Sequence, residues 1–210
     1  MNTKNVLVNL FLWVFIILTH AQGMAGNGKA GDENNDVLLR KTGKLFCFTQ
    51  GGVLAGNPDN VNNAPFVINT SLNYAFSRHI SAGAGVGVEF FHETHLPVTG
   101  NVLYQFGNKR LVPFIMLQAG YQVALESKQT DSRLYYSDLF SSAYYSPRKL
   151  DARGGFMANP SIGIIYYTKY GFGWSLAAGY RYQQLNYKGE DDYKMQIEYN
   201  RLSLQIGFIF

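Results

Sequence analysis

The side chains best able to do chemistry in this sequence are one glutamate and two arginines. Glu89, Arg181 and Arg201 each stand in the polar row of a segment in which apolar and polar or small residues alternate. A period of two places such residues on one face of an extended strand. A charge on an enclosed face is costly unless an opposite charge pairs with it. The sequence therefore predicts that Glu89 pairs with at least one of the two arginines.

Four glutamines share these polar rows and could extend the pair into a hydrogen-bonded network. They are Gln105, Gln118, Gln183 and Gln205. Two interpretations of the network stay open. In the first, polar and charged side chains plug an enclosed space and stiffen the protein; in the second, the glutamate–arginine pair gates a narrow pore.

A second group of chemically capable residues is the segment His92-Glu93-Thr94-His95. Histidine and glutamate close in sequence are typical of metal sites and of catalytic bases. The spacing is not that of the HExxH zinc motif, and no other residues of ligand type cluster nearby in the sequence. We interpret the segment as a polar surface turn and predict no catalytic site, no metal site and no cofactor. A lipid-modifying enzyme remains as a distant alternative.

The segment 126–153 is rich in aromatic residues and carries mixed charges. Tyrosine rings supply a large contact area at a small cost in conformational entropy. One interpretation is a surface loop that binds a ligand, and the other is that the flanking strands simply continue into it. The candidate binding residues are Tyr135, Tyr136, Phe140, Tyr144 and Tyr145.

The elements that must position these side chains are eight segments of strand length. They run over 44–54, 65–76, 80–91, 95–106, 111–125, 154–167, 172–185 and 197–210. Their polar rows hold mainly Gly, Ser, Asn and Gln, whereas a row facing water would be rich in Lys and Glu. We therefore expect the polar rows to line a narrow interior and the apolar rows to face lipid, with aromatic girdles near their ends. Pro113 and Pro160 predict a bulge or local break.

The connections between these segments differ in length on the two sides. Short turns are expected at 77–79, 107–110 and 168–171, and the other side carries the connections 55–64, 92–94, 126–153 and 186–196. Short turns on the periplasmic side and longer loops on the outer side are typical of antiparallel barrels in the outer membrane.

The two ends of the sequence predict export and assembly. Lys4 precedes an apolar run from 6 to 18, and Ala21 completes a cleavage pattern, so residues 1–21 are expected to be a cleaved signal peptide. Residues 22–43 are expected to form a flexible periplasmic leader, and 44–210 a barrel domain. The alternating stretch 202–210 ends in Phe208 and Phe210 and is similar to the C-terminal assembly signal of outer-membrane barrels.

The composition excludes other classes. Only 15% of residues are charged while Gly (22), Tyr (15) and Phe (15) are abundant, which leaves few charges for the surface of a soluble protein. The net charge of +4 comes from scattered basic residues without a recognition motif, so we expect no nucleic-acid binding. The single cysteine, Cys47, cannot form an internal disulfide.

From 44 to 210 the chain resembles the OmpA/OmpX-like family of small outer-membrane barrels. The resemblance rests on the alternation, the connection lengths and the ending at Phe208 and Phe210. It implies an all-β, eight-stranded antiparallel up-and-down transmembrane β-barrel in the outer membrane of a Gram-negative bacterium. It also implies a non-enzymatic role without cofactors, contact with outer-membrane lipid and lipopolysaccharide, and assembly by periplasmic chaperones and the barrel-assembly machinery. A host or surface ligand would bind at loop 126–153.

Overall fold

A computed structural model describes most of the chain from residue 43 to residue 210. The described residues are 43–56, 64–90, 94–107, 110–125, 130–131, 149–169, 172–189 and 194–210, and all belong to one compact unit. The expected signal peptide, nearly all of the leader, His92, Glu93 and the five aromatic candidates between 135 and 145 lie outside the described residues.

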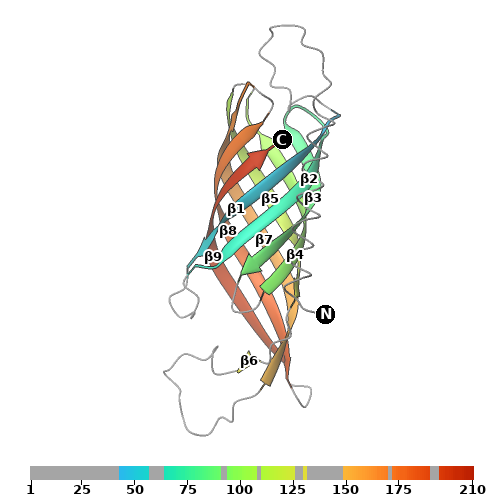
Figure 1. Cartoon of the computed structure of the whole chain (residues 1–210), viewed down its shortest axis with the longest axis vertical. Coiled ribbons are helices and arrows are strands. Elements are labelled where there is room, and N and C mark those ends of the chain that lie inside the picture. The colour runs from blue at the N-terminus through green and yellow to red at the C-terminus, as the bar shows by residue number, and fades with distance from the viewer. Residues whose placement is uncertain are drawn as a thin grey trace. The chain divides into compact units, whose positions relative to one another are not determined.

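The described residues form nine antiparallel strands, and all except the short β6 close into an eight-stranded barrel (Figure 1). The strands are β1 (Leu45–Ala55), β2 (Phe66–Ala75), β3 (Ile80–Phe90), β4 (Thr94–Gln105), β5 (Leu111–Ala124), β6 (Thr130–Asp131), β7 (Lys149–Tyr167), β8 (Gly173–Gly189) and β9 (Lys194–Ile209). β1 pairs with both β2 and β9, β5 pairs with β4 and β7, and the short β6 pairs only with β7. The predicted fold class is confirmed.

The two rows of each strand face where the sequence predicted. In β2, Ser71 and Asn73 are buried while Leu72 and Tyr74 are exposed. The same alternation runs around the barrel, so a continuous surface of large apolar side chains faces outward. The polar rows thus line the lumen.

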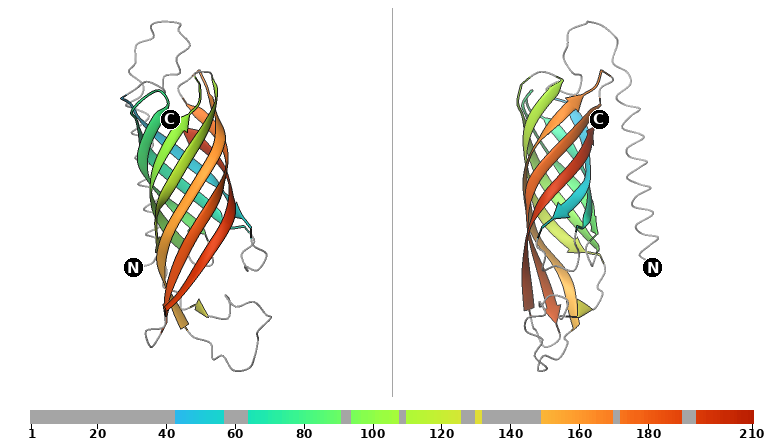
Figure 2. Two further views of the ribbon diagram at one scale, coloured as in Figure 1. Left: turned by 180° about the vertical axis from the view of Figure 1, so that it is seen from behind. Right: turned by 90° about the vertical axis from the view of Figure 1, so that its left-hand side faces the viewer.

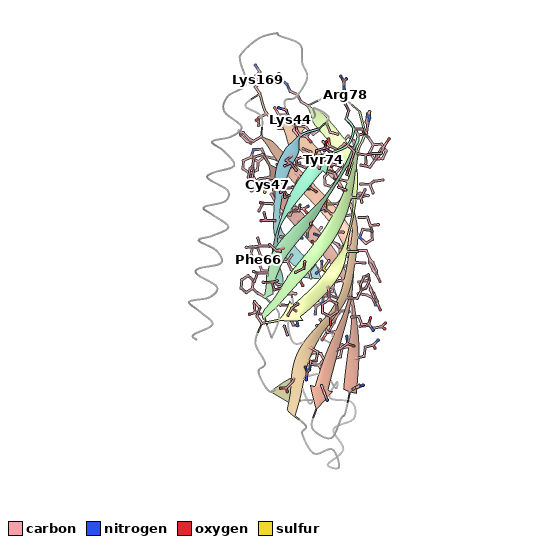
Figure 3. All side chains as sticks on the ribbon, turned by 90° about the vertical axis from the view of Figure 1, so that its right-hand side faces the viewer. Lys44, Cys47, Phe66, Tyr74, Arg78 and Lys169 are labelled. Carbon is pink, nitrogen blue, oxygen red and sulfur yellow. The ribbon has the colours of Figure 1, made fainter. Side chains whose placement is uncertain are left out.

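The connections define the two ends of the barrel. We call the end with the connections 76–79, 106–110 and 168–172 the turn end, and the opposite end the loop end. Figure 3 shows Lys44, Arg78 and Lys169 at the turn end. In the first of these turns, Ser77 Oγ accepts hydrogen bonds from the backbone N–H groups of His79 and Ile80 at 3.2 and 3.0 Å.

Aromatic side chains form an outward girdle at each end. At the turn end the ring of Tyr74 contacts Phe76 at a centroid distance of 5.1 Å, and Trp174 contacts Phe208 at 4.1 Å. At the loop end Phe66 stacks on Phe90 at 6.4 Å. Tyr74 and Phe66, on the same strand, mark the two levels in Figure 3. The expected girdles are therefore present.

Three strands are longer than predicted at the loop end. β7 begins at Lys149 rather than 154, β8 ends at Gly189 rather than 185, and β9 begins at Lys194 rather than 197. The alternation simply continues, because Leu185 and Tyr187 remain on the buried row. The predicted connection 186–196 is therefore wrong, because most of it belongs to β8 and β9. The predicted loop 126–153 is too long at its end, because residues 149–153 belong to β7. Figure 2 shows these strands projecting beyond the others.

The two prolines behave differently from each other. Pro113 pairs with Ile164 without a register shift, so the expected irregularity there is wrong; its carbonyl accepts from the Phe106 N–H at 2.8 Å. At Pro160 the pairing between β7 and β8 is locally interrupted, as expected, because proline has no N–H to donate. The bulge lies elsewhere, at Arg153, where the register between β7 and β8 shifts beside Gly154 (φ 87°).

The C-terminal strand closes the barrel. β9 pairs with β1 from Leu202 to Ile209, and Phe210 and Cys47 exchange backbone hydrogen bonds of 2.7 and 3.0 Å. Phe208 is on the outward row, in the turn-end girdle. In the described ranges we find no helix with the length and apolar character needed to span a bilayer.

Candidate functional site

A buried hydrogen-bonded network around Glu89 occupies the lumen near the loop end. The Glu89 carboxylate accepts from Arg181 Nη2 through Oε1 and from Gln122 Nε2 through Oε2. Gln183 Nε2 donates to Gln122 Oε1 at 2.7 Å and reaches Glu89 Oε2 at 3.4 Å. The predicted pairing of Glu89 with an arginine is present, and three strands (β3, β5 and β8) contribute to the network. We call Glu89, Arg181, Gln122 and Gln183 the Glu89 network.

Two further charged or titratable side chains flank the Glu89 network. Arg201 lies directly opposite Arg181 on β9, is buried, and its guanidinium lies 4.8 Å from the centroid of the Tyr199 ring. His95 lies directly opposite Glu89 on β4 and is almost completely buried. The interpretation of His95 as part of a polar surface turn is therefore wrong, because β4 begins at Thr94 and its second residue already faces inward.

A belt of neutral polar side chains lies between the Glu89 network and the turn end. Gln118 Nε2 donates to Thr99 Oγ1 at 3.3 Å, and Ser203 Oγ donates to Asn159 Oδ1 at 2.9 Å. We call this layer the polar belt; its buried members include Gln50, Thr99, Asn101, Gln118, Asn159, Ser203 and Gln205. Several of its buried atoms have no hydrogen-bond partner among the described residues, namely Gln50 Nε2, Asn101 Oδ1 and Nδ2, Asn159 Nδ2 and Gln205 Oε1. Such atoms inside a protein ordinarily bind water.

At the turn end the same inward rows become apolar. The rings of Phe48 and Phe114 meet edge to face at a centroid distance of 6.3 Å. Around them packs a cluster of buried side chains that we call the apolar plug: Phe46, Phe48, Ala75, Leu103, Val112, Phe114, Met116, Ile165, Tyr167, Ala177 and Ile209. The lumen is therefore not filled by polar and charged side chains alone, and that part of the prediction is wrong.

Two glycines make room for the rings of the apolar plug. A Cβ atom on Gly207 would lie 2.8 Å from the Phe48 ring, and one on Gly163 would lie 2.7 Å from the Phe114 ring. Each aromatic side chain thus packs directly over the backbone of a neighbouring strand. The rings are therefore in close contact with the barrel wall beneath them.

The predicted lumen residues are divided among the three layers. Gln183 joins Glu89 directly, whereas Gln118 and Gln205 lie in the polar belt. Gln105 lies at the turn end, where it accepts from the Tyr167 hydroxyl at 3.1 Å. Of the four glutamines expected to extend the pair, Gln183 does so, and the expectation is wrong for the other three within the described residues. The sequence analysis missed Gln122, although it shares the face of Gln118 four residues away on the same strand.

The described part of the lumen offers hydrogen bonds and the Glu89–Arg181 ion pair. Among the described residues no group of three or more His, Cys, Asp or Glu side chains is arranged to hold a metal ion. The carboxylate of Glu89 is engaged by three donors, which fixes its position.

Structural comparisons place the fold among small outer-membrane barrels. Neisserial surface protein A superposes with a TM-score of 0.50 at 11% identity over 79% of this chain and 94% of that one. The N-terminal β-barrel domain of OprF from Pseudomonas aeruginosa aligns at 14% identity over 81% and 100%, with a TM-score of 0.47. The outer membrane protein OprG from the same organism aligns at 11% identity over 82% and 99%, with a TM-score of 0.48.

No protein-family model and no curated protein sequence matches the chain. The likeness is therefore one of fold: the closed barrel, its strand order and the superposition on Neisserial surface protein A. On these grounds the chain has the fold of the small eight-stranded outer-membrane β-barrels of OmpA/OmpX-like type.

Proposed function

We propose that the protein is an integral outer-membrane barrel with a sealed lumen, which serves as a non-conducting scaffold in the envelope and presents its loop end at the cell surface. The observation that carries the proposal is that two layers of side chains fill the lumen one after the other along its axis. They are the apolar plug at the turn end and the Glu89 network at the loop end, and we call them the two closures. Refolded protein in a planar bilayer is expected to give no steady conductance, and steady single-channel openings would overturn the proposal.

The outward surface supports the location in a membrane. Soluble monomers rarely expose a continuous apolar patch of more than a few hundred Å². Here the middle of the barrel exposes side chains such as Leu72, Ile115, Ile162 and Leu176, bounded by aromatic girdles. A hydrocarbon layer with polar interfaces on both sides matches this pattern.

The orientation can be tested by proteolysis of intact cells. Segment 126–148 contains the trypsin sites Lys128, Arg133 and Arg148, whereas Arg78 and Arg110 belong to the turn-end connections. With the loop end outside, trypsin added to intact cells cleaves at the first group and spares the second. Cleavage at Arg78 while the loop sites survive would contradict this orientation.

The aromatic residues of segment 126–148 are the proposed ligand contacts at the loop end. The projecting parts of β7, β8 and β9 extend the loop end beyond its girdle, and segment 126–148 directly precedes β7 in the sequence. Outer-leaflet lipopolysaccharide is the proposed first partner, since it surrounds any barrel in this position. Replacing Tyr135, Tyr136, Phe140, Tyr144 and Tyr145 with serine should weaken binding of purified lipopolysaccharide to the protein in nanodiscs, and unchanged binding would contradict the proposal.

The ending at Phe208 and Phe210 is proposed to direct assembly. The barrel-assembly machinery would read this strand before it closes against β1, with periplasmic chaperones delivering the chain. Phe210→Ala should reduce the heat-modifiable, folded barrel in the membrane fraction while leaving the exported chain detectable. A normal amount of folded barrel would contradict this role.

A narrow channel is the second candidate function. The polar belt favours it, because its buried atoms without protein partners would hold water in the middle of the lumen. A channel gated by the Glu89–Arg181 pair alone requires that the Glu89→Ala variant conducts.

A further inference from the structure

We propose that the edge of β9 at the loop end binds a second copy of this chain by antiparallel strand pairing centred on Gln196. The residues concerned are Lys194, Gln196 and Glu198, and we call them the β9 edge. This surface lies on the outside of the projecting strands, so its pairing is independent of whether the lumen conducts.

Half of the backbone groups of β9 point away from β8. Phe210 and Cys47 exchange backbone hydrogen bonds of 2.7 and 3.0 Å, so Phe210 bonds toward β1. In an antiparallel ladder every second residue bonds to the same neighbour, and the even-numbered residues of β9 therefore all face this side. β1, however, pairs with β9 only from Leu202 to Ile209.

The β9 edge lies beyond the end of β1 (Figure 2). A Cβ atom on Gly56 would lie 3.5 Å from the Asn200 carbonyl oxygen, so the described part of the β1 side reaches as far as Asn200. Within the described residues no strand pairs with Lys194, Gln196 or Glu198 on that side. A row of N–H and C=O groups without a neighbouring strand is a template for pairing with another chain.

The side chains of the β9 edge favour a second copy as the partner. Lys194, Gln196 and Glu198 are all exposed in the outward row. Glu198 accepts from Gln196 Nε2 at 3.2 Å and from the Tyr182 hydroxyl, and Lys194 forms no ion pair within the described residues. When two copies pair about Gln196, each Lys194 lies opposite the Glu198 of the other copy. The edge is therefore self-complementary, with an opposite-charge pair on each side of two facing glutamines.

The charges distinguish this register from its neighbours. Pairing centred on Lys194 or on Glu198 sets two like charges directly opposite each other, which is destabilising. Pairing centred on Ile197 places Gln196 opposite Glu198 and forms no ion pair. Charged residues on an edge strand ordinarily oppose pairing between copies. Here their four-residue spacing favours one register, the one centred on Gln196.

The contact is short, so two single copies should bind weakly. The three residues of the β9 edge cover far less area than a standard interface. The two-fold axis of an antiparallel pair is perpendicular to the sheet, so the two barrels point in opposite directions. If the loop end lies at the cell surface, as proposed above, the two copies stand in two facing membranes. Many such contacts would then act together, which raises the avidity of adhesion between the membranes.

Disulfide trapping in detergent tests the pairing, because orientation in a membrane and conductance play no part there. In a Cys47→Ser background, Gln196→Cys places two thiols directly opposite each other, at a backbone spacing that a disulfide can bridge. Mild oxidation of the heat-modifiable, folded protein should give a covalent dimer on a non-reducing gel. A yield no higher than that of the matched control would overturn the proposal, and it would leave the proposed scaffold function untouched.

Asn200→Cys in the same background is the matched control. Asn200 is exposed in the same outward row of the same strand. In the proposed dimer the two copies of this residue lie about 27 Å apart, too far for a disulfide. Random collisions would trap both variants equally, whereas edge pairing should trap Gln196→Cys at least about fivefold more.

Exchanging the charges is the second test and depends on the register. Lys194→Glu and Glu198→Lys, each combined with Gln196→Cys, set like charges opposite each other, so each alone should lower the dimer yield about fivefold or more. Mixing the two variants should restore the yield as a heterodimer, identified by a size tag on one of them, because each glutamate of one copy then faces a lysine of the other. Equal yields from the separate and the mixed variants would contradict the proposal.

Discussion

The two ends of the lumen are filled by different kinds of side chain, although both lie on the same inward rows of the same strands. At the turn end, Phe48 and Phe114 contact each other and pack over Gly207 and Gly163. At the loop end, Glu89 and Arg181 bridge the lumen through a charge-assisted bond supported by glutamines. An apolar closure fails by leaving a cavity, whereas a charged closure fails by leaving an uncompensated charge.

This difference shows that the inward row of one strand can be apolar at one end of the barrel and polar at the other. Along β5 the inward residues change from Val112, Phe114 and Met116 to Gln118 and Gln122. The side chains are apolar where rings from opposite walls can meet, and polar or charged where they must pair across the lumen. Substitutions at the two ends should therefore differ in size and in kind.

The largest loss of stability is expected at the loop end, from Glu89→Ala. This change leaves the Arg181 guanidinium buried without its carboxylate, which costs about 3–5 kcal/mol in comparable buried pairs. The free energy of unfolding in lipid vesicles, measured by urea titration, gives the value. The control Glu198→Ala removes an exposed carboxylate and should change stability by less than about 0.5 kcal/mol. Equal losses in both variants would show that the pair does not stabilise the barrel.

The next loss is expected at the turn end, from Phe114→Ala. Removing a fully buried ring from the apolar plug costs about 3 kcal/mol or more, because the cavity collapses only in part. Ile115→Ala, the next residue on β5, faces outward, where lipid fills the vacated space, so its loss should be smaller. Urea titration of both variants tests this, and a larger loss for Ile115→Ala would contradict the account of the plug.

A smaller loss is expected when the plug is crowded rather than emptied. In Gly207→Ala the new Cβ would lie 2.6 Å from Ser175 Oγ and 2.8 Å from the Phe48 ring, so we expect a loss of about 1–3 kcal/mol. Gly100→Ala adds the same methyl group on the outward face, where the nearest atom, the Gly83 carbonyl oxygen, is 3.9 Å away. That control should be neutral or gain about 0.5 kcal/mol. Comparable losses at the two positions would argue against close packing over Gly207.

The smallest of these effects is expected from Gln122→Ala, which removes one donor but keeps the ion pair. The loss should be about 1–2 kcal/mol, typical of a hydrogen bond to a charged group. Combined with Glu89→Ala it should add less than its own value, because both variants disrupt the same contacts. Full additivity in this double-mutant cycle would show that Gln122 acts independently of Glu89.

Much of the fold could be predicted because alternation is a local property of the chain. The eight strands, their inward rows and the pairing of Glu89 with an arginine follow from residues read two apart. The apolar plug could not be predicted, because Phe114 and its neighbour Ile115 are both apolar and only the strand as a whole decides which faces inward. Nor could the contact between Arg181 and Glu89 in particular, since Arg181 and Arg201 lie opposite each other and only the register around the closed barrel places them relative to Glu89.

His95 and Asn159 show the same limit. The alternation of β4 assigns a face to His95. Its place opposite Glu89, however, depends on where β4 begins, and the sequence at that point resembles a surface turn. Asn159 becomes a neighbour of Arg181 only through the register of β7 on β8. Contacts between strands depend on closure, which is a property of the whole barrel.

The central claim is that the two closures act in series, and single-channel recording of the Glu89→Ala variant tests it most directly. The variant is refolded, shown to be a heat-modifiable barrel, and placed in a planar bilayer beside the native protein. The account predicts that both are silent, because the apolar plug still closes the turn end. Steady conductance from Glu89→Ala alone would contradict it and would make the Glu89–Arg181 pair the single gate of a channel.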